Sequence, residues 1–156
     1  MRTMTVCTLA AGLFSVFALS CAGMNAYESA ERNREAGRCA EAVEGYTAAI
    51  ESPGNDHELA RSYYFRSRCN EELGRTGPAY ADAYAAQRVS CYLTATERTM
   101  RTRPLSYVVG PFYCRQDGPA RLEQLGAGLS GQEAQALRMQ VDEGLPRRIL
   151  NVPLPE

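Results

Sequence analysis

The six cysteines are the residues of this chain that could do covalent chemistry. Cys21 stands directly after an apolar run, and the others are spread singly along the chain rather than in CxxC pairs. The one histidine, His57, lies in a polar stretch that is typical of a solvated loop. We therefore expect neither a Ser-His-Asp triad nor a metal site at His57. Glu71 and Glu72 are adjacent, and adjacent residues of a helix point apart. We therefore expect no catalytic residues, no metal and no cofactor.

Cys21 follows a segment with the features of an export signal. Arg2 is the only charge in this segment, and Val6–Leu19 is apolar but too short for a comfortable membrane span. The residues Ala18-Leu19-Ser20-Cys21 resemble a bacterial lipobox, in which the cysteine thiol takes a diacylglyceryl group and becomes the first residue of the mature chain. The alanine departs from that pattern, which usually has leucine. The alternatives are ordinary signal cleavage just before the cysteine and an uncut anchor helix.

The lipobox resemblance implies a protein held on a membrane by acyl chains, each buried methylene of which adds about 0.8 kcal/mol. Ala22, rather than an aspartate, follows Cys21, and by resemblance to lipoprotein sorting this permits passage to the outer membrane, facing the periplasm. Cys7 is lost with the signal and Cys21 is consumed by lipid. An even number of remaining cysteines in an exported chain indicates disulfides, and three pairings are possible for Cys39, Cys69, Cys91 and Cys114.

The charged residues argue against a nucleic-acid partner. The chain has 17 basic residues, all of them arginine, and 18 acidic residues, for a formal net charge of −1. Because the two signs are interspersed, we expect a solvated helical surface and no polybasic face for nucleic acid or membrane. A length of 156 residues allows one modest domain plus additional segments.

An internal repeat organises the middle of the chain. An offset of 37 residues aligns Gly37 with Gly74, and this period is typical of helix-pair repeats. The other identical pairs at this offset are Tyr27/Tyr64, Asn33/Asn70, Glu35/Glu72, Arg38/Arg75, Ala42/Ala79, Ala48/Ala85 and Ala49/Ala86.

Each repeat predicts two helices, with a glycine ending the first helix of each pair. The first unit gives helices over 24–35 and 39–51, stopped by Pro53-Gly54, and the second gives helices over 59–73 and 76–89. Large apolar stripes are missing from these helices. Their predicted buried faces consist of alanine, tyrosine and glycine, so the helices must approach each other closely.

The C-terminal third is less regular. We expect a short helix begun at Thr94 or Thr96, an extended apolar segment over 105–114, and a helix over 119–125 with Leu122 and Leu125 inward. A capping box at Ser130 and Glu133 opens a helix to about 143. The predicted organisation has four parts. A signal covers 1–20, and two hairpins cover 21–93. An extended segment and a helical cap, or a degenerate third repeat, cover 94–145, and a Pro-rich tail covers 146–156. Ala134, Leu137 and Val141 share one face of the last helix.

The two hairpins resemble tetratricopeptide repeats. Unit one carries the pattern at Gly37, Ala42, Tyr46, Ala49 and Pro53, and unit two carries it at Gly74, Ala79, Asp82 and Ala86. The departures lie in the first helices, where Ala26 replaces a large aromatic residue, Arg66 replaces a leucine, and Asn33 and Asn70 replace a tyrosine. The period exceeds the family norm by a few residues, which the loop at 53–57 is expected to absorb. The resemblance covers about 25–91 and implies an all-α fold, a short α-solenoid of such hairpins with a C-terminal helical cap.

The resemblance also implies a concave groove lined by the first helices. Its groove positions fall on Tyr27, Glu31, Arg34, Arg61, Tyr64 and Arg68, which suit peptide recognition; the alternative is an ordinary solvated face. In stacked hairpins the start of one second helix lies near the end of the next first helix. This arrangement pairs Cys39 with Cys69, and Cys91 with Cys114.

These features predict a membrane-anchored, tetratricopeptide-like module that binds or scaffolds proteins in the bacterial cell envelope. The expected partner is a protein or peptide, with the membrane reached through the lipid anchor and no contact with nucleic acid. The alternative is a secreted enzyme or inhibitor with its site around Tyr107–Cys114. A third hypothesis is a purely structural element that coats the envelope.

Overall fold

A computed structural model describes residues 25–97 and 109–155, and the described residues contain helices and no strand. The predicted signal over 1–20, the lipidation site Cys21 and the segment 98–108 lie outside them. The helices are α1 (Ala26–Glu35), α2 (Cys39–Glu51), α3 (Asp56–Glu72), α4 (Thr76–Thr96), the π-helical turn η3 (Tyr113–Asp117), α5 (Gly118–Gly126), α6 (Gly131–Gly144) and α7 (Arg147–Leu150). The expectation of an all-α protein is confirmed over this part of the chain.

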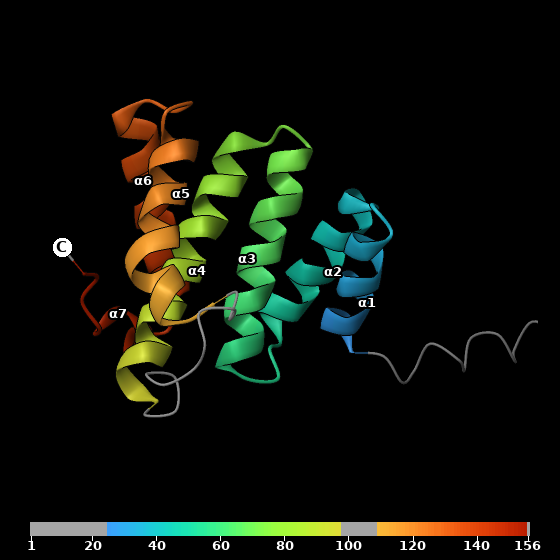
Figure 1. The fold of residues 1–156 in the computed structure, drawn as a ribbon, viewed down its shortest axis with the longest axis horizontal. Coiled ribbons are helices and arrows are strands. Elements are labelled where there is room, and N and C mark those ends of the chain that lie inside the picture. Colours follow the sequence, from blue (N-terminus) through green and yellow to red (C-terminus); the bar gives the residue numbers. More distant parts are fainter. Residues whose placement is uncertain (1–24, 98–108, 156) are drawn as a thin grey trace, which may run out of the picture.

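The first four helices stand side by side in chain order. Figure 1 shows α1 at one end of the stack, α2 and α3 next to it, and α4 beyond them, with α5 and α6 covering the far side of α4. Helices α1 with α2 and α3 with α4 form antiparallel hairpins, and α2 also packs on α3. Neighbours in sequence are therefore neighbours in space.

The two hairpins turn in the same way. Gly37 and Gly74 have φ values of 72° and 71°, a left-handed conformation that side chains with a Cβ rarely adopt. After each glycine an arginine N–H donates to an asparagine carbonyl oxygen at 2.8 Å: Arg38 to Asn33 in the first turn, and Arg75 to Asn70 in the second. The offset of 37 residues thus relates two turns of the same geometry, and the predicted helix ends are confirmed.

The second hairpin is longer than the first at its open end. Helix α3 begins at Asp56, because the Asn55 side chain accepts a hydrogen bond from the Glu58 N–H at 2.9 Å. The expected loop over 53–57 is therefore wrong in part, and the additional residues of the repeat extend α3. Helix α4 continues to Thr96 instead of ending near Val89.

Two threonines at the end of α4 continue the helix rather than begin a new one. The Thr94 and Thr96 hydroxyls donate to the carbonyl oxygens of Ser90 and Tyr92, at 2.7 and 2.8 Å. Such bonds to the preceding turn occupy the hydroxyls inside the helix, so neither threonine is available as an N-cap. The predicted start of a short helix at either threonine is wrong, and the rest of that predicted helix, from residue 98 onward, lies outside the described residues.

Small side chains fill the seams between the first helices. Ala42, Ala49, Ala79 and Ala86 are at most 1 % exposed, as predicted. A Cβ added at Gly45 of α2 would lie 2.9 Å from the Cβ and 3.1 Å from the Cα of Ala30 of α1. The backbones of α1 and α2 therefore cross at a distance that only glycine allows.

We expect Gly45→Leu to lower the free energy of unfolding by about 2 kcal/mol or more. A leucine side chain has no space against Ala30, and overpacking a core typically costs about 1–3 kcal/mol. Denaturant unfolding followed by circular dichroism measures the effect. The exposed Ala48 of the same helix gives the control, since Ala48→Leu adds the same side chain on the solvent side. Equal stability of the two variants would contradict the close crossing of α1 and α2.

The segment before α5 is helical from Pro111 onward. Val109 and Gly110 form a bend and Pro111–Cys114 is already helical, so the expected extended segment over 105–114 is wrong for residues 111–114. Pro119 has no N–H to donate, and the helix widens into η3 just before it. The Gln87 side chain of α4 donates to the carbonyl oxygen of Cys114 at 3.1 Å. A side chain of α4 thus fixes the entry into α5.

Helices α5 and α6 cover the side chains of α4. Leu122 and Leu125 of α5 are buried against Tyr80 and Tyr84, and the predicted α6 face of Ala134, Leu137 and Val141 packs on the same cluster. The turn between α5 and α6 has no left-handed glycine like those of the two hairpins, since the positive-φ glycines of the described chain are Gly37 and Gly74. Helices α5 and α6 therefore cover α4 without repeating the turn of the two hairpins.

The predicted loose tail over 146–156 is wrong in part. Arg147–Leu150 form the short helix α7, and Ile149 is fully buried in a core cluster with Leu59 of α3 and Val89 of α4. Burial of this isoleucine contributes about 1.5–3 kcal/mol. Arg88 of α4 also donates to the carbonyl oxygens of Leu150 and Val152, so several contacts hold this end of the chain against the hairpin.

Candidate functional site

The six predicted groove residues lie on α1 and α3, on a surface that these two helices share. Tyr27 and Arg61 meet between the helices, with the Arg61 guanidinium carbon 5.2 Å from the centre of the Tyr27 ring. Arg61 also approaches Glu31, at 3.8 Å between Nη2 and Oε2. The structure therefore brings together residues that the repeat offset placed in different units.

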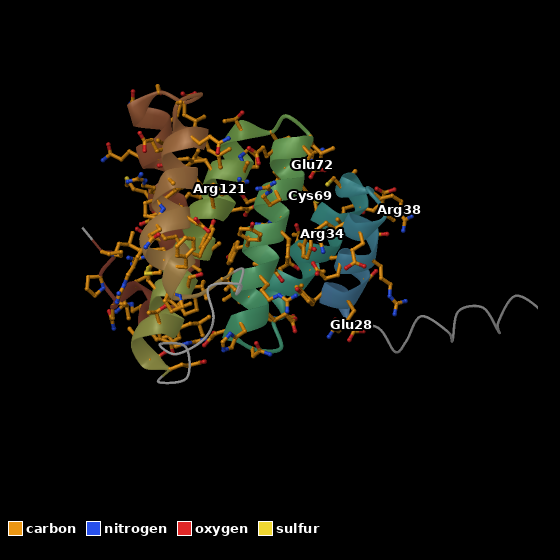
Figure 2. All side chains as sticks on the ribbon, in the orientation of Figure 1. Glu28, Arg34, Arg38, Cys69, Glu72 and Arg121 are labelled. Carbon is orange, nitrogen blue, oxygen red and sulfur yellow. A yellow bond between two sulfur atoms is a disulfide. The ribbon has the colours of Figure 1, made fainter. Side chains whose placement is uncertain are left out.

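Glu31 connects the surface to the core of the first hairpin. It accepts hydrogen bonds from Arg34, with Nη2 to Oε2 at 3.2 Å, and from the hydroxyl of buried Tyr46 on α2. Arg34 in turn lies over the Phe65 ring of α3, 4.3 Å from its centre, and Figure 2 shows Arg34 between α1 and α3. This network holds the guanidinium groups of Arg34 and Arg61 in fixed positions.

Aromatic rings continue the surface from α3 to η3. Tyr64 packs edge-on against Phe65 at 5.1 Å and against Tyr113 at 5.3 Å between ring centres. Arg68, one turn further along α3, is 51 % exposed. The α1–α3 face, defined here as Tyr27, Glu31, Arg34, Arg61, Tyr64, Phe65 and Arg68, therefore joins Tyr113 without a break.

Phe65 and Tyr113 were not among the predicted groove residues. Phe65 has no aromatic counterpart at the repeat offset, where Glu28 stands, so the comparison of the units could not find it. Tyr113 reaches α3 only through the packing of η3. The aromatic character of residues 105–114 was a signal for contact with the hairpins, but it gave no partner.

The tyrosine hydroxyls of this region remain protonated over a wide pH range. Burial raises the pKa of Tyr27, and nearby Glu31 raises it further. Burial likewise raises the pKa values of Tyr46 and Tyr113. A ligand that reaches this surface therefore meets O–H donors and guanidinium groups.

A second polar cluster lies between α2, α3 and α4. Arg66 donates two hydrogen bonds to Asp82, at 2.7 and 3.0 Å, and a third to the Thr47 hydroxyl at 2.9 Å. Asn70 donates to the same carboxylate at 3.0 Å. Burial raises the pKa of Asp82, while Arg66 and Asn70 oppose that shift. Two residues that depart from the repeat pattern, Arg66 and Asn70, thus satisfy one buried carboxylate.

This cluster borders a hollow between the first hairpins and the C-terminal helices. The hollow measures about 490 Å³ and lies between α2 and α6, with Val43, Leu137 and Val141 among its apolar walls. Arg66 and Asp82 on its wall are already paired with each other, so they have little capacity left for a ligand. We assign the cluster to stability.

The four remaining cysteines divide into a bonded pair and a free pair. Cys91 of α4 and Cys114 of η3 form a disulfide, as predicted. Cys39 and Cys69 are both buried and free, so the predicted bond between them is absent. Cys39 instead donates to Glu72 at 3.1 Å, and Figure 2 shows Cys69 and Glu72 near the same end of α3. Burial raises the pKa of Cys39, and hydrogen bonds with Cys69 and Glu72 add to the shift.

The free pair predicts a specific reactivity. In the folded chain a disulfide-exchange reagent at neutral pH should modify Cys39 and Cys69 only slowly, because both thiols are buried and the thiolate is disfavoured. After denaturation without reductant, the same reagent should find both thiols. Cys21 is counted separately in this experiment. If the reagent modifies neither Cys39 nor Cys69 in the denatured chain, the two are bonded to each other.

His57 is not a loop residue as expected. It lies in the first turn of α3, and its Nε2 is 2.9 Å from Oε2 of Glu97 at the end of α4. Glu71 and Glu72 point to different partners, Arg121 and Cys39, as expected for neighbours on a helix. Across residues 25–97 and 109–155, no group of three or more His, Cys, Asp or Glu side chains is placed to hold a metal ion.

The segment named for the alternative function, Tyr107–Cys114, is described only from Val109 onward. Within it Tyr113 is 2 % exposed and Cys114 is in the disulfide.

None of the helices in the described part of the chain is long and apolar enough to cross a membrane. No known protein family, curated protein or solved structure matches the chain.

Proposed function

We infer that the protein is a membrane-anchored module of tetratricopeptide-like hairpins that binds a partner protein in the bacterial cell envelope. The observation that carries this proposal is the α1–α3 face, where residues from both repeats form one network of arginine and aromatic contacts. The repeated left-handed glycine turn and the alanine seams support the repeat architecture. Arginine and tyrosine are enriched among residues that dominate the energy of protein interfaces.

The anchor part of the proposal rests on the sequence around Cys21. A lipobox there gives a mature chain that starts with an acylated cysteine and stays on the periplasmic side of the outer membrane. Mass spectrometry of the N-terminal peptide from membranes of an expressing cell tests it. The proposal expects a diacylglyceryl-modified Cys21, and Cys21→Ala should release the chain from the membrane. An N-terminus at Ala22 or elsewhere without lipid would reject the anchor and leave the binding face unaffected.

Charge reversal on the face tests the binding function. Arg61 is 44 % exposed, so Arg61→Glu should fold normally while it places two carboxylates, Glu31 and the new one, against each other. The matched control is Arg147→Glu on α7, which is also exposed and is not part of the α1–α3 face. Proteins that co-isolate with the wild type and with the control, but not with Arg61→Glu, support the proposal. The same set of proteins with all three chains would contradict it.

A further inference from the structure

A small polar hollow lies where α3 meets η3 and α5. Its volume is about 240 Å³. Pockets that enclose a whole small molecule usually measure about 300–1,000 Å³, so this hollow has the size for one side chain of a partner. The lining residues used below are Tyr64 and Arg68 of α3, Tyr113 and Asp117 of η3, and Arg121 and Gln124 of α5.

Two buried hydrogen-bond donors at this hollow lack a partner among the described residues. The hydroxyl of Tyr113 is one, on a residue that is 2 % exposed. The Nε of Arg121 is the other, on a side chain that is 9 % exposed. Buried polar groups in proteins are almost always hydrogen-bonded, so two unpaired donors on the wall of one hollow indicate a ligand that accepts from both.

The neighbours of Arg121 in the described chain leave its Nε without a partner. Its Nη2 donates to Glu71 at 3.0 Å and to the Ser67 hydroxyl at 3.1 Å, which ties the side chain to α3 (Figure 2). Glu71 therefore engages Nη2 and not Nε. Asp117 has the same sign as an acidic ligand, but it is exposed at the rim of the hollow.

The remaining groups of the hollow favour an anionic acceptor. The Arg68 guanidinium is half exposed and meets Glu71 only at 4.0 Å, so it is available to a ligand. The Gln124 amide is exposed on the α5 side. A guanidinium group carries only hydrogen-bond donors, and a tyrosine hydroxyl also donates, so a planar carboxylate is a suitable partner for both.

We propose that this hollow binds the carboxylate side chain of a glutamate or aspartate in an extended segment of the partner protein. Arg121 Nε and the Tyr113 hydroxyl donate to the carboxylate, and Arg68 covers it from α3. The assignment rests on the proposed binding function and names the chemistry of the partner. Tyr64 contacts both Phe65 and Tyr113, so a segment lying on the α1–α3 face reaches the hollow directly.

The proposal is tested with peptides and the full chain in detergent micelles. The probe is the blocked peptide acetyl-Gly-Ser-Glu-Ser-Gly-amide, compared with the same peptide carrying glutamine in place of glutamate. In a chain labelled with ¹⁵N-arginine, we expect the Nε–H signal of Arg121 to shift with the glutamate peptide. A charge-assisted hydrogen bond in place of a neutral one predicts at least about tenfold tighter binding of the glutamate peptide.

Tyr113→Phe is the decisive variant, because it removes only a hydroxyl that has no partner among the described residues and keeps the ring in place. It should weaken binding of the glutamate peptide about fivefold or more, and Arg68→Gln should act in the same direction. Arg32→Gln, exposed on α1, is the matched control and should bind as the wild type. Arg121→Gln is less informative, since loss of its bond to Glu71 can disturb the fold.

Equal affinity for the two peptides, or an unchanged affinity in Tyr113→Phe, overturns the proposal. Binding of the glutamine peptide carrying a free C-terminal carboxylate, but not of the glutamate peptide, overturns the assignment to a side chain. These outcomes are separate from the co-isolation experiment with Arg61→Glu. Co-isolation can depend on Arg61 even when the glutamate peptide does not bind. Conversely, co-isolation that does not depend on Arg61 leaves the peptide affinities unaffected.

Discussion

Replacing Asp82 with alanine should lower the free energy of unfolding by about 3 kcal/mol. The substitution removes the carboxylate that accepts two hydrogen bonds from Arg66 and one from Asn70. Arg66 is then left with its charge in a site where its side chain is 19 % exposed. Removal of one partner of a buried ion pair costs about 3–5 kcal/mol, and the partial exposure of Arg66 places the loss near the lower end of that range.

Two controls separate the buried pair from ion pairs in general. Asp56 pairs with Arg148, whose side chain is 56 % exposed, so Asp56→Ala should cost below about 1 kcal/mol. The double variant Arg66→Leu with Asp82→Asn removes both charges and keeps an oxygen that accepts from Asn70. It should lie within about 1 kcal/mol of the wild type, because a buried ion pair contributes little net stability. Guanidinium unfolding measures all three, and an Asp82→Ala loss no larger than that of Asp56→Ala would contradict the role of Asp82.

Loss of the disulfide between Cys91 and Cys114 should cost about 3 kcal/mol. The bond closes a loop with a sequence separation of 23 residues, and cross-linking a loop of this length restricts the unfolded chain by about that amount. In thermal unfolding this corresponds to a fall of about 10 °C for a domain of this size. The double variant Cys91→Ala with Cys114→Ala avoids the burial of new hydroxyls.

A reductant provides the matched comparison for the disulfide. Dithiothreitol should lower the unfolding temperature of the wild type to that of the double variant, and it should leave the double variant unchanged. Cys39→Ala with Cys69→Ala keeps the disulfide, so the reductant should destabilise this variant as it does the wild type. A reductant effect that survives loss of Cys91 and Cys114 would place a stabilising disulfide elsewhere.

The parts of the fold that follow from local rules could be predicted from the sequence. Gly37 and Gly74 end helices because the left-handed turn needs glycine, and this needs no knowledge of the rest of the chain. The alanines of the seams recur with the repeat, so their burial followed from the offset. The start of α3 was misplaced because Asn55 was assigned to a loop, although an asparagine followed three residues later by glutamate is a helix-capping pattern.

The errors elsewhere came from contacts between distant residues. The Gly-Pro sequence before Cys114 was treated as a break, but proline is tolerated in the first turn of a helix. Further along, Gln87 from α4 donates to the carbonyl oxygen of Cys114. Arg66 departs from the repeat pattern, and the sequence did not indicate that Asp82 is its partner. The hollow around Tyr113 and Arg121 forms only when α5 packs on α3, and no spacing in the sequence relates these residues.

The most direct test of the binding face is site-specific photo-crosslinking in cells that express the protein. A photoreactive benzoylphenylalanine is placed at Arg61 or Arg68 on the α1–α3 face, and at the exposed Glu44 of α2 or Arg147 of α7 for comparison. The account predicts one and the same partner protein crosslinked from both face positions and not from the two comparison positions. A partner captured from Glu44 or Arg147 and not from the face would contradict it.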